Sequence, residues 1–268
     1  MDRSLLKNII IIILVLVNGF LLASLFMRQT SAVQFRQQTE EQLTELFAAD
    51  GMTLDKAAFS QKTPPSVFTL TRNLQLERDV AAFLLGNSLI QEDQGGGTYT
   101  YTGDSGVARF RSNGSFEVAG SLSSGNAEAL CRSFCKSFSY DSLTFCLDET
   151  GTGTATAVCF CNDLPVFNCT VTFTIHHGEL RTVSGILLSQ EGSSTVSDVT
   201  PLSATAALTT FQNVRREIGA VVSSVTEASL CYELQSSSAL TLTPSWCIVT
   251  DTKSYYVNCI TGAVTAEN

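Results

Sequence analysis

The strongest pattern in the chain is an apolar run near its N-terminus. From Asn8 to Met27 no side chain is charged, and consecutive isoleucines fill the positions from Ile9 to Ile13. About 20 helical residues cross a hydrocarbon core of about 30 Å. A cleaved signal peptide would have a shorter apolar region followed by a small-residue cleavage site. The run therefore predicts an uncleaved transmembrane anchor over residues 8–27, preceded by a cytoplasmic stub over residues 1–7.

Three residues inside the run suggest contact with another helix. Asn18 lies at mid-span, where an amide that faces lipid is costly. Gly19 and Ala23 form a small-xxx-small pair, which allows a second helix to approach closely. The alternative is a lone Asn tolerated by a very apolar helix, with Gly19 and Ala23 present by chance. We interpret the three residues as a partner-binding stripe.

Beyond the run, helical and strand periodicities alternate along the chain. Residues 34–49 predict a helix that ends at Asp50-Gly51, within a juxtamembrane helix and linker over residues 28–50. Further helices are expected over 76–85, 126–138 and 204–218. Period-two alternation predicts strands over 67–71, 98–101, 107–111, 116–118, 143–147, 156–161, 166–175, 180–188, 229–234, 240–250, 254–259 and 263–265.

This order of elements predicts an α+β fold. Single helices lead into runs of antiparallel strands, whereas a parallel βαβ arrangement would need about one helix per strand. We expect an N-terminal transmembrane helix followed by curved antiparallel sheets with helices packed on one face. The order of helix and then meander also suggests a repeated unit. The expected subdomains are an N-terminal extracytoplasmic α+β unit over residues 51–122 and a C-terminal α+β unit over residues 123–268.

Charge narrows the location and the partners. The chain has 268 residues and a formal net charge of -9, so its folded part would repel nucleic acid and anionic lipid. Arg3 and Lys7 precede the apolar run and Arg28 follows it, which favours a cytoplasmic N-terminus modestly. We expect a single-pass protein of the cell membrane whose C-terminal domain is extracytoplasmic, with no nucleic-acid partner.

The residues that carry chemistry form no recognisable catalytic or metal site. The two histidines of the chain, His176 and His177, are adjacent and precede Gly178 at the tip of an expected hairpin, so we interpret them as exposed turn residues. The run Gly95–Gly97 lacks a lysine and does not open a helix, so it fails as a phosphate-binding loop. We predict no catalytic residues, no cofactor and no metal.

The nine cysteines fit no familiar zinc spacing. They fall mostly at apolar positions, which favours a role as small hydrophobic core residues over a disulfide framework. An external location would permit disulfides, and Cys247 with Cys259, on successive strands, is the pair to test first.

The C-terminal stretch carries a distinctive motif. Pro244 and Trp246 form a Pro-x-Trp strand, and Tyr256, Asn258 and Gly262 belong to a Tyr-Val-Asn-x-x-Thr-Gly segment that follows. The motif resembles the one that closes the YycI and YycH regulatory proteins and the wider PepSY-like domains. As a hairpin, it would use Trp246 as a core anchor and would turn the chain between Asn258 and Gly262.

Two further segments agree with the resemblance. The Leu-Pro-Val-Phe-Asn segment at 164–168 leads into a strand, a turn and a second strand, and residues 17–22 are similar to the YycI anchor. Residues 123–268 would then be a PepSY-like, YycI-like subdomain. Cys247 and Cys259 depart from the family pattern, which has a basic residue and an Ala or polar residue at these positions. They weaken any transfer of a specific binding surface.

The resemblance implies a regulatory function without enzymatic activity. YycI-like proteins are membrane-anchored accessory proteins of a cell-wall two-component system, and they act on a sensor histidine kinase by transmembrane and extracytoplasmic contacts. The implied partners are the sensor histidine kinase, a YycH-like companion protein and the membrane. An alternative is a PepSY-like inhibitor or chaperone of an exported peptidase. A third reading, an exported hydrolase that uses His176 or His177, finds no support nearby in the sequence.

Overall fold

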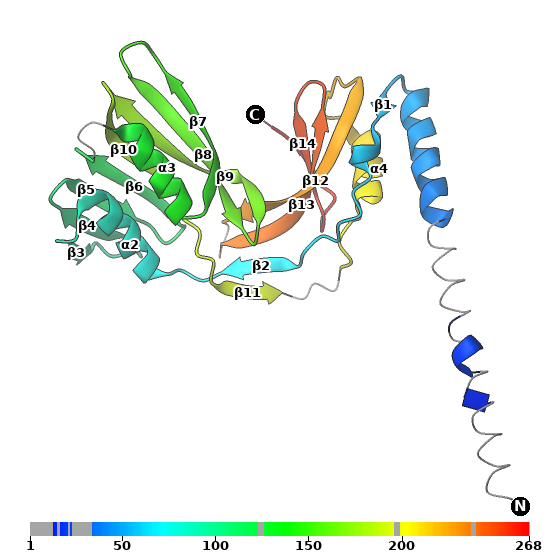
Figure 1. The fold of residues 1–268 in the computed structure, drawn as a ribbon, viewed down its shortest axis with the longest axis horizontal. Coiled ribbons are helices and arrows are strands. Elements are labelled where there is room, and N and C mark those ends of the chain that lie inside the picture. The colour runs from blue at the N-terminus through cyan, green and yellow to red at the C-terminus, as the bar shows by residue number, and fades with distance from the viewer. Residues whose placement is uncertain are drawn as a thin grey trace, which may run out of the picture.

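The structure is a computed structural model that describes residues 13–14, 17–20, 22, 34–122, 126–195, 199–236 and 240–267. It consists of two lobes joined by a continuous sheet (Figure 1). Each lobe has its own cluster of buried apolar side chains.

The first lobe is an antiparallel sheet covered by helices on one face (Figure 1). Its strands lie in the order β7-β8-β9-β10-β6-β5-β4-β3. Asn73 and Asn126 begin the two helices, because their side chains accept hydrogen bonds from Leu76 N and Ala129 N, both at 3.0 Å. The bounds are α2 (Leu74–Leu85), β3 (Ile90–Asp93), β4 (Tyr99–Gly103), β5 (Gly106–Phe110), β6 (Ser115–Gly120), α3 (Ala127–Ser137), β7 (Tyr140–Leu147), β8 (Gly153–Cys161), β9 (Leu164–His176) and β10 (Glu179–Ile186).

The second lobe packs a strongly twisted meander against helices. Its core contains Phe47 from the helix over 34–49, Phe211 from α4 and Trp246 from β13, each 0 % exposed. The bounds are β1 (Thr53–Leu54), η1 (Lys56–Ala58), α4 (Ala204–Val214), β12 (Ser224–Gln235), β13 (Thr241–Thr250), β14 (Ser254–Asn258) and β15 (Val264–Ala266). Two more strands, β2 (Val67–Leu70) and β11 (Gly192–Thr195), run below both lobes and pair with each other (Figure 1).

Strand β9 joins the two lobes. Its C-terminal part pairs with β8 and β10 inside the first lobe, whereas Val166 near its start pairs with Tyr232 of β12 in a parallel register. Between these parts the ladder with β8 shifts, so that Cys159 lies opposite Val166 while Val158 lies opposite Thr170. Residues 167–169 therefore form a bulge at the junction of the lobes.

The expected fold class is wrong. We expected a transmembrane helix followed by curved antiparallel sheets, with helix-plus-meander units that repeat. Instead, the described residues form mostly one large sheet of 15 strands with few helices, and the sheet is mixed, because β1–β12 and β12–β9 are parallel pairs. Periodicity along the chain located most of the strands, but it carries no information on which strands pair.

Among the residues that the structure describes, no helix is long and apolar enough to cross a membrane. Most of the predicted anchor over residues 8–27 lies outside the described residues.

Candidate functional site

The C-terminal motif builds the centre of the second lobe. Trp246 is fully buried, and its Nε1 donates a hydrogen bond to Leu202 O at 2.8 Å, which ties β13 to the segment before α4. The backbone carbonyl of Pro244 accepts a hydrogen bond from Cys259 N at 2.9 Å. The predicted role of Trp246 as a core anchor is confirmed by its burial.

The turn after β14 also matches the motif. Asn258 Oδ1 accepts hydrogen bonds from Ile260 N and Thr261 N, both at 3.0 Å, and Gly262 N donates to Asn258 O at 2.9 Å. Gly262 adopts a φ of 72°, a left-handed conformation that favours glycine. The side-chain amide of Asn258 also donates to Glu233 Oε2 at 2.8 Å, so the turn is fixed to β12.

Two segments that carried the sequence resemblance meet at the junction of the lobes. Phe167, in the bulge of β9, stacks on Tyr256 of β14 with ring centroids 3.7 Å apart and an interplanar angle of 7°. Such an aromatic pair contributes about 0.5–1.5 kcal/mol beyond its buried area. The stack therefore helps to hold the first lobe against the C-terminal motif.

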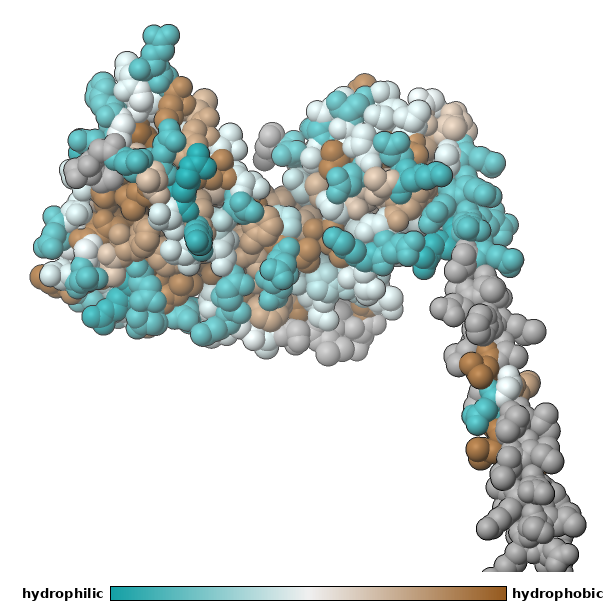
Figure 2. Space-filling view, in the orientation of Figure 1, coloured by the Kyte–Doolittle hydropathy of each residue, from teal (hydrophilic) through white to brown (hydrophobic). Residues whose placement is uncertain are grey.

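The neighbouring Asn168 reinforces this junction. Its side chain donates a hydrogen bond to Leu234 O at 2.9 Å and accepts one from Leu234 N at 2.8 Å. The Asn168 amide therefore pairs with the backbone of β12 as a residue of a neighbouring strand would. We call Phe167, Asn168, Leu234 and Tyr256 the junction residues. They lie where two distant parts of the chain are brought together, and Figure 2 shows the surface hollowed between the two lobes.

The sheet face that carries Tyr256 also carries thiols and a buried hydroxyl. Cys247 lies opposite Tyr256, and Cys231 lies opposite Ser245, in the ladders of β12, β13 and β14. Burial raises the pKa of the Cys247 thiol and of the Tyr256 phenol. Ser245 Oγ is buried and has no hydrogen-bond partner within the described part of the chain. Neutral, weakly nucleophilic groups of this kind suit packing better than catalysis.

A second feature couples the helix over 34–49 to the second lobe. Leu43 and Phe47 are buried in the core of that lobe, and the helix ends at Asp50-Gly51, as the sequence predicted. Asp50 Oδ2 accepts hydrogen bonds from Gln212 Nε2 at 2.6 Å and from Arg215 Nη2 at 2.7 Å.

Asp50 also binds a second arginine. Its Oδ1 accepts a hydrogen bond from Arg216 Nη2 at 2.7 Å. The hydrogen bond from Arg215 and the positive charges of Arg216 and Arg215 together hold the pKa of the Asp50 carboxyl below its usual value. We call Asp50, Gln212, Arg215 and Arg216 the Asp50 clamp, because it fixes the helix over 34–49 to the end of α4.

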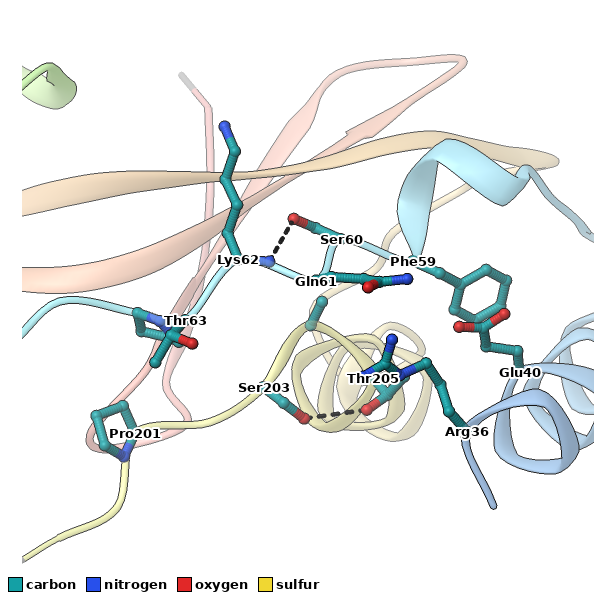
Figure 3. Close-up of a pocket in the computed structure, with 12 residues that line it drawn as sticks. Arg36, Glu40, Phe59, Ser60, Gln61, Lys62, Thr63, Pro201, Ser203 and Thr205 are labelled. Atoms are coloured by element: carbon teal, nitrogen blue, oxygen red, sulfur yellow. Dashed lines mark hydrogen bonds between the residues drawn. The ribbon is translucent and has the colours of Figure 1, made fainter. Parts of the chain in front are cut away.

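A pocket of about 280 Å³ opens beside this helix. Figure 3 shows Arg36 and Glu40 of the helix on one side, the segment from Phe59 to Thr63 across the pocket, and Ser203 with Thr205 at the start of α4. The lining comes from three segments and mixes polar side chains with apolar ones such as Phe59 and Pro201. It combines single charges and hydroxyls, with no paired nucleophile and base among the residues that line it.

The partner-binding stripe predicted in the apolar run stays a prediction. Asn18 and Gly19 lie in a helical stretch and are exposed, and no atom of the described residues comes within 4 Å of a Cβ placed on Gly19. Ala23 lies outside the described residues.

The histidines and cysteines lie mostly where the sequence placed them. His176 and His177 are exposed at the tip of the β9–β10 hairpin, with ring centroids 4.5 Å apart. All nine thiols are free in this structure, and most of them are buried. Cys259 belongs to the core of the second lobe, whereas Cys247 lies on the opposite sheet face beside Tyr256. The pairing of Cys247 with Cys259 is therefore not formed. No group of potential ligands for a metal ion occurs among the described residues.

Sequence reasoning missed both the junction residues and the Asp50 clamp. Asp50 and Arg215 are separated by 165 positions, and Phe167 and Tyr256 are also far apart in the chain. The Arg215-Arg216 pair was the one available signal for the clamp, because two adjacent cations repel each other and an acidic side chain nearby relieves the repulsion.

Comparison with known proteins leaves the family open. No family model and no curated protein matches the sequence. An uncharacterized protein from Eubacterium rectale is similar in structure over 81% of this chain and 90% of its own, with a TM-score of 0.42 and 10% identity. The C-terminal domain of Bacillus megaterium YpeB covers 75% of this chain and 99% of its own length, with a TM-score of 0.36 and 10% identity. Both likenesses are weak, and neither concerns YycI or YycH.

Proposed function

We propose that the chain is a non-enzymatic regulatory protein that acts by direct contact with a partner protein outside the cytoplasm. The partner that the sequence resemblance suggests is a sensor histidine kinase of a cell-wall two-component system, together with a YycH-like companion protein. The reaction belongs to the kinase, and this chain changes its rate by binding.

The Asp50 clamp is the observation that carries this proposal. The clamp and the buried side chains of Leu43 and Phe47 make the helix over 34–49 part of the second lobe. A displacement of the N-terminal segment would therefore be passed to α4 and to the sheet behind it rather than absorbed by a loop. A regulator that reports contact at one end of its chain to the other needs such a connection.

The junction residues support the same proposal. They link β9 of the first lobe to β12 and β14 of the second through side chains rather than through a long ladder. Two arrangements of the lobes that differ in these side-chain contacts would form a two-state element that a partner can bias. A partner that prefers one arrangement would then select it.

Co-purification and kinase assays test the proposal. The full chain, carrying an affinity tag, is expressed with the sensor histidine kinase and the YycH-like protein of the same organism. We expect the kinase to co-purify and its autophosphorylation rate in proteoliposomes to change when the chain is present. Asp50→Arg, which places a cation against Arg215 and Arg216, should reduce that change in rate. The fluorescence of Trp246 checks that the variant is still folded.

Glu45→Arg is the matched control, because it makes the same change of charge at an exposed position of the same helix. It should leave the effect on the kinase unaltered. A chain that neither co-purifies with the kinase nor changes its autophosphorylation would refute the proposal. Inhibition of an exported peptidase by the same preparation would instead favour the inhibitor alternative.

A further inference from the structure

Strand β7 is an edge strand of the first lobe's sheet, and over part of its length it lacks the features that usually keep edge strands from pairing with another chain. Among the described strands it pairs with β8 alone, and the hairpin of β7 and β8 projects from the lobe (Figure 1). From Ser142 to Leu147 the sequence contains no charged residue and no proline. Natural edge strands are generally guarded by charges, prolines or bulges. A register shift near Ser142, which has a φ of 59°, distorts the first half of β7 and so protects it from pairing. The backbone edge of residues 143–147 has no such distortion and remains free to pair.

The opposite border of the same sheet shows what such protection looks like. Strand β3 is exposed along its whole length and carries Glu92 and Asp93. Two adjacent carboxylates discourage another strand from pairing there. The two edge strands of this sheet therefore differ in charge, and β7, whose residues 142–147 are uncharged, is the one suited to accept a further strand.

Half-buried apolar side chains follow the open border. Leu143, Phe145 and Leu147 point to the core side of the sheet and pack against the first core, but each stays partly exposed because no described strand lies beyond β7. Side chains of a neighbouring strand would lie beside this row at every second position. An added strand with apolar residues at alternate positions would cover the row.

Helix α3 places two basic side chains, Arg132 and Lys136, beside the same edge. An open pocket of about 570 Å³ lies between α3 and the start of β7, lined by Arg132 and Lys136 from the helix and by Leu143 from the strand. The guanidinium of Arg132 lies over the ring of Phe145, 5.4 Å from its centroid. Both cations are exposed, and Lys136 has no ion pair within the described residues.

Three carboxylates accompany these cations: Glu128 beside Arg132, and Asp141 and Asp163 in the lining of the pocket. Arg132 approaches Glu128 at 4.0 Å, a distance at which an exposed pair contributes little. Asp141, at the start of β7, accepts a hydrogen bond from Ser142 N at 2.7 Å and belongs to the local turn. Asp163 also lines the pocket and forms no ion pair with Arg132 or Lys136. An acidic side chain of a bound segment would therefore meet two cations on α3 that have at most one weak ion pair within the described residues.

We propose that the open border of β7 binds an extended segment of a partner protein by strand addition. Backbone hydrogen bonds to residues 143–147 supply affinity, alternate apolar side chains cover Leu143, Phe145 and Leu147, and an acidic residue reaches Arg132 and Lys136. This inference rests on the proposed function, since it names the surface through which a partner would be bound.

A library of random octapeptides displayed on phage tests the inference with the immobilised full chain. We expect enrichment of peptides with apolar residues at alternate positions and an Asp or Glu. A fluorescein-labelled copy of the most enriched peptide should bind in solution. N-methylation of every second amide should abolish binding for one set of amides and spare the other, because one edge of an added strand pairs with β7.

Charge reversal locates the peptide. Arg132→Glu with Lys136→Glu should weaken binding of the acidic peptide about tenfold, and a peptide with Lys in place of the acidic residue should regain it. Lys62→Glu with Arg78→Glu is the matched control, since these cations are exposed and lie outside this border.

Three outcomes would overturn the inference: no enrichment, binding that ignores both N-methylation sets, or binding that ignores the Arg132 and Lys136 reversal. Association of the chain with itself through β7, detected by sedimentation and abolished by Leu143→Lys, would also overturn it in favour of a second copy as the occupant. If the kinase still co-purifies in any of these cases, the proposed function stands and only this surface is wrong.

Discussion

Burial decides the chemistry of the cysteine side chains. It raises the pKa of the Cys131 thiol to about 12 and the pKa of the Cys135 and Cys161 thiols to about 11. The thiolate is the reactive form, so these groups are inert near neutral pH as well as being shielded from solvent. Cys146 on β7 is the exposed member of the set, and Cys247 is half-buried.

Alkylation of the native chain by iodoacetamide at pH 8 should therefore show one fast-reacting thiol. Cys146→Ser should remove that phase, because its thiol is the exposed one, and peptide mass spectrometry identifies the modified residue. Cys247→Ser serves as the control and should leave the fast phase in place. A fast phase that survives in Cys146→Ser would show that another thiol is accessible.

At the residue scale, the sequence predicts what depends on a residue and its near neighbours. Trp246 as a core anchor, Gly262 in the turn and the helix stop at Asp50-Gly51 all follow from local composition, and the structure places each as expected. The Phe167–Tyr256 stack and the Asp50 clamp depend on the path of the chain between their members. The periodicity of the sequence carries no information on that path.

At the scale of elements, exposure explains which strands the sequence missed. β11 consists of Gly-Ser-Ser-Thr, and β3 reads Ile-Gln-Glu-Asp with every residue exposed. β11 contains no apolar side chain, and β3 has no buried face, so neither shows an alternation of apolar and polar residues. β1 covers only Thr53 and Leu54 and is too short for any pattern. The helices were predicted well because their Asn and Ser caps and apolar stripes are local signals.

The attachment of the helix over 34–49 should depend on pH through Asp50. Its folded-state pKa lies below the ordinary value of 3.8, so the carboxylate stabilises the docked helix above that pH. The contribution is lost as the pH falls through the lowered pKa and Asp50 becomes protonated. Hydrogen exchange, corrected for its intrinsic pH dependence, should show the amides of this helix losing protection in that range while those of α3 remain protected.

Two variants separate this effect from general acid unfolding. Asp50→Asn cannot ionise, so the helix should be less protected at pH 6 and should show little further change on acidification. Glu45→Gln, on the exposed side of the same helix, should behave as the parent chain. Equal acid sensitivity in the parent chain and in Asp50→Asn would show that the clamp does not hold the helix.

At the scale of the whole molecule, one sheet serves two cores. β9 pairs inside the first lobe along most of its length, while the bulge at 167–169 and Val166 connect it to β12. From Cys169 to His176 buried residues alternate with more exposed ones as in an ordinary strand, and the alternation is interrupted at the bulge. The sequence therefore predicted the position of β9 but not its role as a bridge. This bridge is one of the two parallel pairs that make the sheet mixed, the other being β1 with β12.

Asn168→Ala should uncouple the unfolding of the two lobes. Trp246 is the one tryptophan of the chain and is buried in the second core, so its fluorescence reports that lobe, whereas alkylation of the buried Cys131 reports the first. In the parent chain we expect the two signals to change at the same urea concentration.

The variant loses both hydrogen bonds to Leu234. Because Asn168 is exposed, water replaces part of them, which leaves a cost of about 1–2 kcal/mol in the free energy of unfolding. Because the lost hydrogen bonds join β9 to β12, the fluorescence transition should separate from the thiol transition. Asn87→Ala, an exposed amide outside the junction, should keep them coincident. Transitions that stay together in Asn168→Ala would show that the pairing of β12 with β9 and the Phe167–Tyr256 stack are enough to hold the lobes as one cooperative unit.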